Sequence, residues 1–256
     1  MLILLSPSKT LDFTTPPAVK THTLPQFVDE AAQLIDKLRT LTPKKLAKLM
    51  DISDKLASEN VQRYAAWQRE HSAENAKQAV LAFRGDVYDG LNVDAWKPAD
   101  FTFAQTHLRT LSGLYGLLRP FDWIQPYRLE MGTSLKVGRK KDLYAFWGTE
   151  VTDAVNEALA EAKARTLVNL ASHEYFNVIQ PEAIEAEIIT PVFKEERNGK
   201  FSFMSFFGKK ARGLMADYII RQRLTLPEEM KKFDVDGYRF NAALSTEYEW
   251  AFTRKS

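Results

Sequence analysis

The chain begins with five apolar residues, Met1-Leu-Ile-Leu-Leu5, and a polar segment, Ser6-Pro-Ser-Lys-Thr10, follows at once. Five residues are too few to span a bilayer, and no basic segment precedes them, as a secretion signal requires. A short apolar run that ends at turn residues is typical of a fully buried strand. The sequence therefore predicts a buried strand that begins at the first residue, with Ser6 to Thr10 after its carboxyl end.

The composition excludes several classes of protein. The chain has 256 residues, of which 45% are hydrophobic and 12% aromatic, as in a globular protein with a sizeable core. It contains no cysteine, which excludes a disulfide scaffold, a thiolate metal site and a cysteine nucleophile. No later segment approaches about 18 uncharged apolar residues, the length of a membrane-spanning helix. We therefore expect a cytoplasmic protein without membrane contact.

Helical periodicity dominates the first 70 residues after the opening strand. Apolar residues recur at helical spacing from Phe27 to Leu38. Thr42-Pro43 and Ser53-Asp54 are typical starts of two further helices, because hydroxyl side chains cap helices and proline is tolerated in the first turn. This segment predicts an N-terminal helical array.

Strand signals are concentrated later in the chain. The apolar run Ala79–Phe83 and the segment Thr166–Ser172 are both typical of buried strands, and Asn198-Gly199 between apolar segments predicts a hairpin. We find no repeat, low-complexity segment or linker. The sequence thus predicts an α/β (α+β) fold in a single domain, residues 1–256, with a mixed, partly antiparallel sheet.

The formal net charge of +2 conceals an uneven distribution. Residues 101–148 carry seven basic and three acidic residues, and residues 200–223 carry six and one, so these segments hold +4 and +5. The other 184 residues sum to −7. If the two segments converge in space, they form a positive cleft suited to phosphates. The alternative is that helix faces distribute these charges into solvent.

A glycine-bounded turn lies inside the first basic segment, in Leu108-Arg-Thr-Leu-Ser-Gly-Leu-Tyr-Gly-Leu-Leu-Arg119. A helix followed by Gly113-x-x-Gly116 resembles the hairpin of helix-hairpin-helix modules, in which backbone N–H groups contact DNA phosphates. Arg109 and Arg119 would add phosphate contacts. The alternative is that Gly113 only ends a helix, and Pro120 shortens any second one.

Several polar clusters are candidates for binding an anion. Ser6, Lys9 and Thr10 follow the opening strand, and hydroxyls with a lysine there suit a phosphate or carboxylate, although the absence of glycine excludes a P-loop. The loop Arg84–Gly90 and the segment Pro126–Glu130 supply further polar groups. Each has an ordinary surface loop as its alternative.

Cations also cluster at the start of a predicted helix, where Lys209, Lys210 and Arg212 precede Gly213. Positive charge there opposes the helix dipole, which favours an anionic partner over a purely structural role.

No motif for catalysis or metal binding is present. The four histidines lie far apart in sequence, His107 has the spacing of a packed residue on a helix face, and no Gly-x-Ser-x-Gly or paired-carboxylate motif appears. We predict no catalytic residue, no metal ligand and no cofactor, and the sequence does not indicate an enzyme.

Seven blocks, in order along the chain, resemble the bacterial YaaA family. They are Met1-Leu-Ile-Leu-Leu-Ser-Pro-Ser-Lys-Thr-Leu-Asp12, Ile52-Ser-Asp-Lys-Leu56, Ala82-Phe-Arg-Gly-Asp-Val-Tyr88, Leu111-Ser-Gly-Leu-Tyr-Gly-Leu-Leu-Arg-Pro120, Gln125-Pro-Tyr-Arg-Leu-Glu-Met-Gly132, Leu170-Ala-Ser172 with Glu174-Tyr-Phe176, and Lys209-Lys-Ala-Arg-Gly-Leu-Met215. The resemblance implies a peroxide-stress protein that limits damage by unincorporated iron. It further implies a positive cleft, a helix-hairpin-helix element and binding to duplex or distorted DNA.

The resemblance assigns residues to two groups. The cleft candidates are Ser6, Lys9, Thr10, Arg84, Tyr88, Arg128, Lys209, Lys210 and Arg212. The hairpin candidates are Ser112, Gly113, Tyr115 and Gly116, to which the residue analysis adds Arg109 and Arg119. The chain departs from the family pattern at His173, where we expect Asp, and after Phe240.

Two hypotheses follow. In the first, the protein binds DNA without sequence preference through the positive cleft. In the alternative, it is an enzyme or sensor for a small nucleotide-like or phosphorylated ligand in the same cleft. Direct iron chelation ranks third, because the sequence lacks ligand-spaced clusters.

Overall fold

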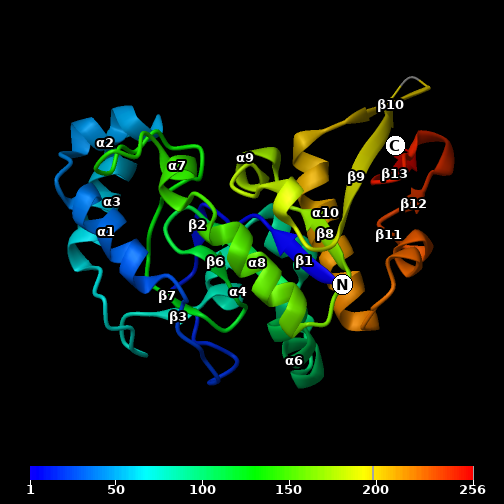
Figure 1. Ribbon diagram of the computed structural model, residues 1–256, viewed down its shortest axis with the longest axis horizontal. Coiled ribbons are helices and arrows are strands. Elements are labelled where there is room, and N and C mark those ends of the chain that lie inside the picture. The colour runs from blue at the N-terminus through cyan, green and yellow to red at the C-terminus, as the bar shows by residue number, and fades with distance from the viewer. Residues whose placement is uncertain (198, 256) are drawn as a thin grey trace.

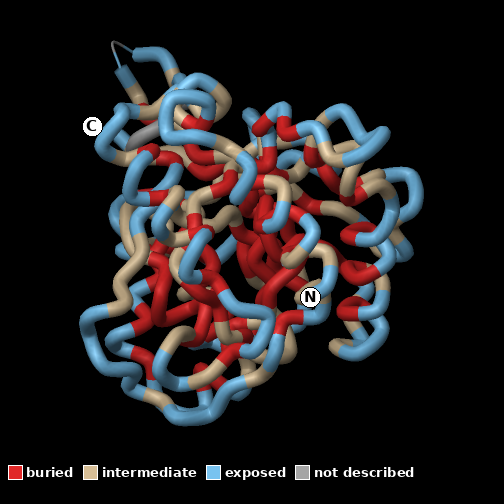
Figure 2. Tube along the Cα trace, turned by 90° about the vertical axis from the view of Figure 1, so that its left-hand side faces the viewer, coloured by how far each residue is buried: buried red, intermediate tan, exposed pale blue. Residues whose placement is uncertain are grey.

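The first strand lies inside the main sheet. The computed structural model describes residues 1–197 and 199–255. In it, β1 (Leu2–Leu5) lies between β5 (Leu108–Ser112) and β8 (Thr166–Leu170) and runs parallel to both. All four residues of β1 are buried, and Figure 2 shows buried residues concentrated in the middle of the molecule. The predicted buried strands at the first residue and at Thr166 are confirmed.

The rest of the sheet is mixed. β8 is parallel to β9 (Glu187–Arg197), which is itself parallel to β13 (Glu249–Lys255). The antiparallel additions are β10 (Lys200–Phe203) on β9, β12 (Tyr238–Phe240) on β13, β11 (Asp234–Val235) on β12, and β6 (Gly116–Leu118) on β5. The α/β class and the partly antiparallel sheet are therefore confirmed. Asn198 of the predicted hairpin lies outside the described residues, and the strands on either side of it pair as predicted.

The N-terminal helical array is also confirmed. It consists of α1 (Val28–Arg39), α2 (Pro43–Met50) and α3 (Asp54–Ala66), gathered at one end of the molecule (Figure 1). The Thr42 hydroxyl accepts a hydrogen bond from the backbone N–H of Lys45 at 3.4 Å, and the Ser53 hydroxyl accepts one from Leu56 at 3.3 Å. These side chains satisfy N–H groups that a helix leaves unpaired at its start.

The remaining elements connect and cover the sheet. They are α4 (Ala79–Ala82), α5 (Asp86–Leu91), α6 (Pro98–His107), α7 (Leu143–Trp147), α8 (Glu150–Glu161), α9 (His173–Phe176), α10 (Ser205–Gln222), the 3₁₀ turns η1 (Val93–Ala95), η2 (Pro181–Ala183), η3 (Pro227–Lys232) and η4 (Ala242–Leu244), and the strand pairs β2 (Thr10–Leu11) with β4 (Phe83–Arg84) and β3 (Lys77–Gln78) with β7 (Trp123–Ile124). The apolar run that predicted a strand at Ala79–Phe83 is mostly the short helix α4, so that prediction is wrong. No described helix is both long and apolar enough to cross a membrane.

The helix-hairpin-helix-like element predicted at Leu108–Arg119 is wrong. The helix ends at His107, and Leu108 already has the extended dihedral angles φ −118° and ψ 135°. Residues 108–112 and 116–118 form the antiparallel pair β5–β6. The reason is that helical spacing continues by chance from Phe103 to Leu111, whereas the backbone beyond His107 pairs with the buried strand β1.

Two glycines fix the crossing of α5 and α10. A Cβ atom at Gly213 would lie 1.8 Å from the carbonyl oxygen of Val87, and one at Gly90 would lie 2.2 Å from that of Lys210. Only hydrogen fits at these distances, so the two helices approach backbone to backbone. This contact places α10 against the segment that follows β4.

We predict that Gly213→Ala lowers the free energy of unfolding by about 3 kcal/mol, because the added methyl forces the helices apart and outweighs alanine's higher helix propensity. Urea denaturation measures this value. Lys209→Ala, at an exposed position of the same helix, is the control and should change stability by no more than about 0.5 kcal/mol. Equal stabilities of the two variants would contradict the close helix contact.

Candidate functional site

The loops after β1 and β8 meet at one edge of the sheet. The backbone N–H of Ser172 donates to Ser6 Oγ at 2.8 Å, and the two hydroxyl oxygens lie 3.3 Å apart. Because parallel strands end at the same edge, the polar groups that follow them converge there, which is where open α/β sheets bind ligands.

Tyr88 is hydrogen-bonded to the loop that follows β1. Its hydroxyl donates to the carbonyl oxygen of Ser6 at 3.3 Å and lies 3.4 Å from Thr110 Oγ1. Tyr88 is 4% exposed, and burial raises the pKa of its hydroxyl above the usual value. The residue therefore holds the loop after β1 in place, and its ring is not available at the surface.

Three charged side chains form an ion cluster above the strand ends. Glu130 binds Lys9 Nζ through Oε2 at 2.6 Å and Arg128 Nη2 through Oε1 at 2.8 Å. Arg128 Nε is buried without a hydrogen-bond partner among the described residues. The cluster carries one net positive charge and leaves one guanidinium donor unused.

Thr10 and Arg84 lie opposite one another where β2 pairs with β4. Arg84 contacts the carboxylates of Asp12 at 3.5 Å and Asp94 at 3.7 Å. Hydrogen bonds from the Thr15 backbone lower the pKa of Asp12, so its carboxylate stays ionised beside Arg84. Thr10 itself is exposed. We use the name strand-end site for Ser6, Lys9, Thr10, Arg84, Tyr88, Arg128, Glu130 and Ser172.

The cations of α10 lie farther along the helix than the sequence predicts. The helix begins at Ser205, so Lys209, Lys210 and Arg212 lie beyond its first turn, and the argument from the helix dipole does not apply. Lys209 and Lys210 are exposed. Arg212 is half-buried, and burial lowers the pKa of its guanidinium. Among the described residues, no ion pair joins Lys209 or Lys210 to the strand-end site.

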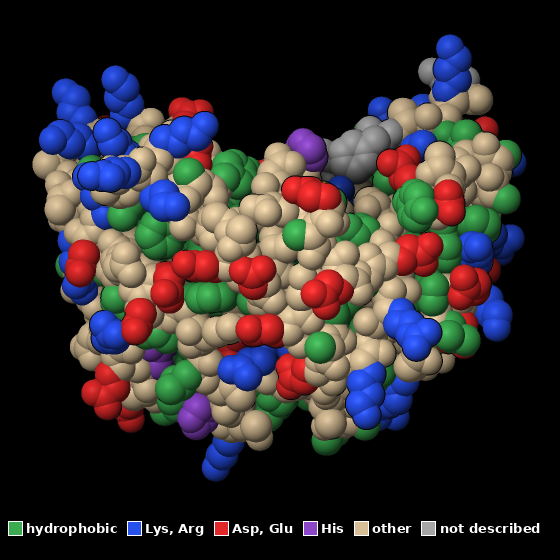
Figure 3. Space-filling view, viewed as in Figure 1, with side chains coloured by type: hydrophobic (Ala, Val, Ile, Leu, Met, Phe, Trp, Pro, Cys, Tyr) green, Lys and Arg blue, Asp and Glu red, His purple; other side chains and the backbone are tan. Residues whose placement is uncertain are grey.

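The upper face of the molecule is hollowed between two projecting parts (Figure 3). α9 and the start of α10 lie between these parts (Figure 1). The projection on the left carries a group of Lys and Arg side chains over α2 and the loop that precedes α7. We call its cations the basic horn: Lys44, Lys45, Lys48, Lys136, Arg139, Lys140 and Lys141.

Every member of the basic horn is exposed. Among the described residues, only Lys141 of this set has an ion pair, a 4.0 Å contact with Asp142. The sequence analysis missed the α2 lysines. Their signal is present in Pro43-Lys-Lys-Leu-Ala-Lys48, where lysines occupy one face of a helix that buries Leu46 on the other.

The hairpin candidates lie inside the protein, so their predicted role as DNA contacts is wrong. Ser112, Gly113, Tyr115 and Gly116 are all buried. Ser112 Oγ lies 2.7 Å from the Tyr127 hydroxyl, and a Cβ at Gly113 would lie 2.3 Å from the carbonyl oxygen of Leu129. Gly116 has a φ of +65°, which the tight turn between β5 and β6 requires.

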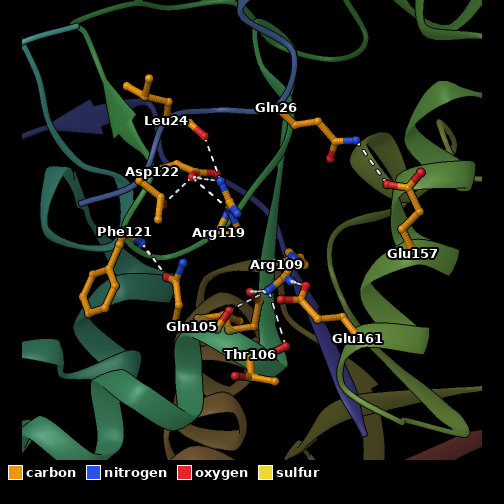
Figure 4. A network of polar contacts seen from close by, with 12 residues as sticks. Leu24, Gln26, Gln105, Thr106, Arg109, Arg119, Phe121, Asp122, Glu157 and Glu161 are labelled. Carbon is orange, nitrogen blue, oxygen red and sulfur yellow. Dashed lines mark hydrogen bonds and ion pairs between the residues drawn. The ribbon is translucent and has the colours of Figure 1, made fainter. Parts of the chain in front are cut away.

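Arg109 and Arg119 belong to the structural network of Figure 4. Arg109 is 3% exposed and donates to the carbonyl oxygens of Gln105 and Leu108, each at 2.9 Å, and to Glu161 at 3.2 Å. Arg119 pairs with the buried Asp122 at 3.0 Å. The same hydrogen bonds connect the end of α6 to β5. These guanidinium groups therefore already have hydrogen-bond partners within the protein.

We predict that Arg109→Met lowers the free energy of unfolding by about 2 kcal/mol, because the carbonyl groups of Leu108 and Gln105, the first buried and the second half-buried, lose their donor. Chemical denaturation at neutral pH measures the change. Arg139→Met removes an exposed arginine and serves as the control, with an expected change within about 0.5 kcal/mol. A stable Arg109→Met variant would show that the network does not support the fold.

Among the described residues, no group of three or more His, Cys, Asp or Glu side chains is placed to hold a metal ion.

Comparison with known proteins identifies relatives along the full chain. The profile of the family described as "Peroxide stress protein YaaA" matches residues 1–244. A "UPF0246 protein" of Ralstonia pickettii (strain 12J) is 56% identical over 255 residues, covering 100% of this chain and 99% of its own. A "UPF0246 protein" of Cellvibrio japonicus (strain Ueda107) is 54% identical over 255 residues with the same coverage. These matches confirm the family resemblance of the sequence blocks.

Proposed function

Because the chain belongs to the family of peroxide stress protein YaaA, which supports a role in the response to oxidative stress, we propose that it binds DNA through its hollowed face and basic horn. On this proposal, the bound protein covers the DNA and so limits the damage that unincorporated iron does to the DNA. The observation that carries the proposal is the basic horn, a set of exposed cations of which only Lys141 has an ion pair among the described residues.

The charge balance of the basic horn supports a polyanionic partner. Within residues 43–54 and 136–142 its seven cations are accompanied by Asp51, Asp54 and Asp142, which leaves a net charge of +4. Like charges held close together repel one another, and phosphates relieve that repulsion while releasing counterions. Such contacts give affinity without reading the base sequence.

The join between α2 and α3 supplies a suitable backbone geometry. Asp51 adopts the left-handed conformation with φ +50°, and the N–H of Ile52 donates to the carbonyl oxygen of Ala47 at 3.1 Å. Ser53 then caps α3. Two helices joined by so short a turn hold the start of α3 beside the end of α2, so the α2 lysine side chains supply the phosphate contacts. We place the DNA-contacting hairpin here, and not at residues 108–119.

We predict that Lys44→Ala combined with Lys48→Ala weakens binding to a duplex of arbitrary sequence. It should also reduce the slope of log K against log salt by up to about 1.8, because each phosphate that a lysine no longer neutralises lowers the slope by about 0.9. Fluorescence anisotropy from about 50 to 200 mM salt measures both quantities.

The control for this experiment removes two cations from other parts of the surface. Lys97→Ala combined with Lys232→Ala causes the same change in net charge at two exposed residues outside the basic horn, one just before α6 and one at the end of η3. The proposal fails if the two double variants have equal slopes, or if wild-type binding does not depend on salt.

One observation favours a second function at the strand-end site. Arg128 Nε is buried without a hydrogen-bond partner among the described residues. Lys9 and Arg128 both bind the carboxylate of Glu130. A phosphorylated or nucleotide-like small ligand would accept from this unused donor and from Lys9, and the hydroxyls of Ser6 and Ser172 lie at the same edge. This function is that of an enzyme or sensor acting on a small anion.

For this second function we predict that a panel of nucleotides and sugar phosphates contains a ligand that raises the melting temperature. Saturation at about 100 times Kd adds about 2.7 kcal/mol of stability. Lys9→Ala should reduce this shift and leave DNA affinity unchanged, whereas Lys232→Ala should preserve both. Absence of any shift across the panel, together with intact DNA binding, would reject the small-ligand function.

A further inference from the structure

A separate cavity lies between the segment 13–22 and the end of α3, bordered by β3 and β7 at the lower left of Figure 1. Its volume is about 870 Å³, within the usual range of about 300–1,000 Å³ for small-molecule sites. Aromatic side chains form much of its wall: Phe13, His22, Trp67 and Trp123. No residue that lines it belongs to the basic horn or to the strand-end site, so the cavity is distinct from both.

Two buried side chains of β3 hold one wall of the cavity in place. Gln78 Nε2 donates to the carbonyl oxygens of Val19 at 2.6 Å and Thr21 at 2.9 Å. Lys77 Nζ donates to two more carbonyl oxygens, within residues 12–15, at 2.9 and 2.8 Å. These four hydrogen bonds fix a segment that has almost no regular structure, so a ligand that enters meets a wall that is already ordered.

The amide of Gln78 has one polar atom without a partner. Its Oε1 is buried and accepts no hydrogen bond within the described part of the chain, and the residue, which lines the cavity, is 1% exposed. Turning the amide over would not relieve this, because Nε2 is held by two carbonyl oxygens. A buried acceptor without a donor is unfavourable. The cavity wall therefore favours a ligand that donates a hydrogen bond.

This acceptor belongs to a residue paired with an aromatic one. Gln78 lies directly opposite Trp123 where β3 pairs with β7, and opposite residues of an antiparallel pair project from the same face with Cβ atoms about 5 Å apart. Trp123 in turn stacks on His22, with ring centroids 3.5 Å apart and 4° between the planes. Rigid aromatic surfaces bind planar rings at low cost in side-chain entropy. The pairing favours a planar ring with a donor at its edge.

The charges that line the cavity select neither sign. Arg63 is paired with Glu59. Lys20 and Glu74 both line the cavity and are exposed, and neither has an ion pair with a described residue. These two carry opposite charges, and an ion enclosed by aromatic and aliphatic walls would lose its hydration. The lining therefore suits a neutral ligand.

We propose that this cavity binds a neutral planar aromatic ligand that donates one hydrogen bond, from an N–H or O–H group at its edge, to Gln78 Oε1. The ring packs against the wall that Trp123 forms. This inference is independent of DNA binding and of the small anion considered above, because it uses no residue of the basic horn or of the strand-end site.

The test compares indole with benzofuran, which has the same shape but a ring oxygen in place of the N–H group. Isothermal titration calorimetry should show saturable binding of indole to the full chain. Indole should bind about tenfold more tightly than benzofuran, because benzofuran leaves the buried Oε1 without a donor.

Three variants locate the hydrogen bond and the ring. Gln78→Met removes the acceptor and should bind both probes with equal affinity. Gln62→Met makes the same change at an exposed glutamine that lines the same cavity, and it should keep the preference for indole. Trp123→Ala should weaken both probes by a similar factor. Melting temperatures show that each variant is folded, and if Gln78→Met is not, Trp123→Ala and the two probes on the wild type still test the site.

Four outcomes would overturn the proposal. The first is no saturable binding of indole by the wild type. The second is equal affinity of the wild type for indole and benzofuran, which would show that the donor contributes nothing. The third is a preference for indole that persists in folded Gln78→Met, which would assign the hydrogen bond to another acceptor. The fourth is unchanged affinity in Trp123→Ala, which would place the probes elsewhere.

Discussion

The burial of β1 between two parallel neighbours is the constraint on which the rest of the structure depends. Its register is continuous from Ile3 to Leu5 with β5 and from Leu2 to Leu5 with β8. Both strands that pair with its backbone are more than 100 residues away in sequence. Parallel pairing requires long crossover connections, and the helices of those connections cover the sheet. The same pairing aligns the strand ends, so the hydrogen bond between Ser172 and Ser6 is a direct consequence of the central register.

A second constraint connects this sheet to the hollowed face. The backbone contact between Gly213 and Val87 fixes α10 relative to α5, and α5 follows the strand pair that carries Arg84. The start of α10 then lies between the two projections. Because glycine is the only residue that allows this approach, the position of the exposed lysines of α10 depends on two residues that have no side chain.

Errors in the sequence prediction arose where local pattern and tertiary pairing disagree. Leu108 to Leu111 continues a helical spacing that begins in α6, yet pairing with β1 is more favourable than one additional helical turn. At Ala79–Ala82 the error was the reverse: a short apolar run with the pattern of a strand forms one turn of helix. Short, fully buried segments have no polar face, and periodicity cannot distinguish helix from strand there. By contrast, Thr42 and Ser53 were predictable because capping depends on neighbours three residues away.

The sequence by itself determined the buried opening strand, the capped helices α2 and α3, the α/β class and the family, because each depends on local chemistry or on motifs that remain in order along the chain. Only the tertiary structure decided which polar residues share a site. Arg109 and Arg128 occur in the same basic segment, but the fold buries the first against backbone carbonyls and places the second beside Lys9 and Glu130. The charge of a segment, counted from its sequence, does not show which of its side chains are buried, because burial depends on contacts between distant segments.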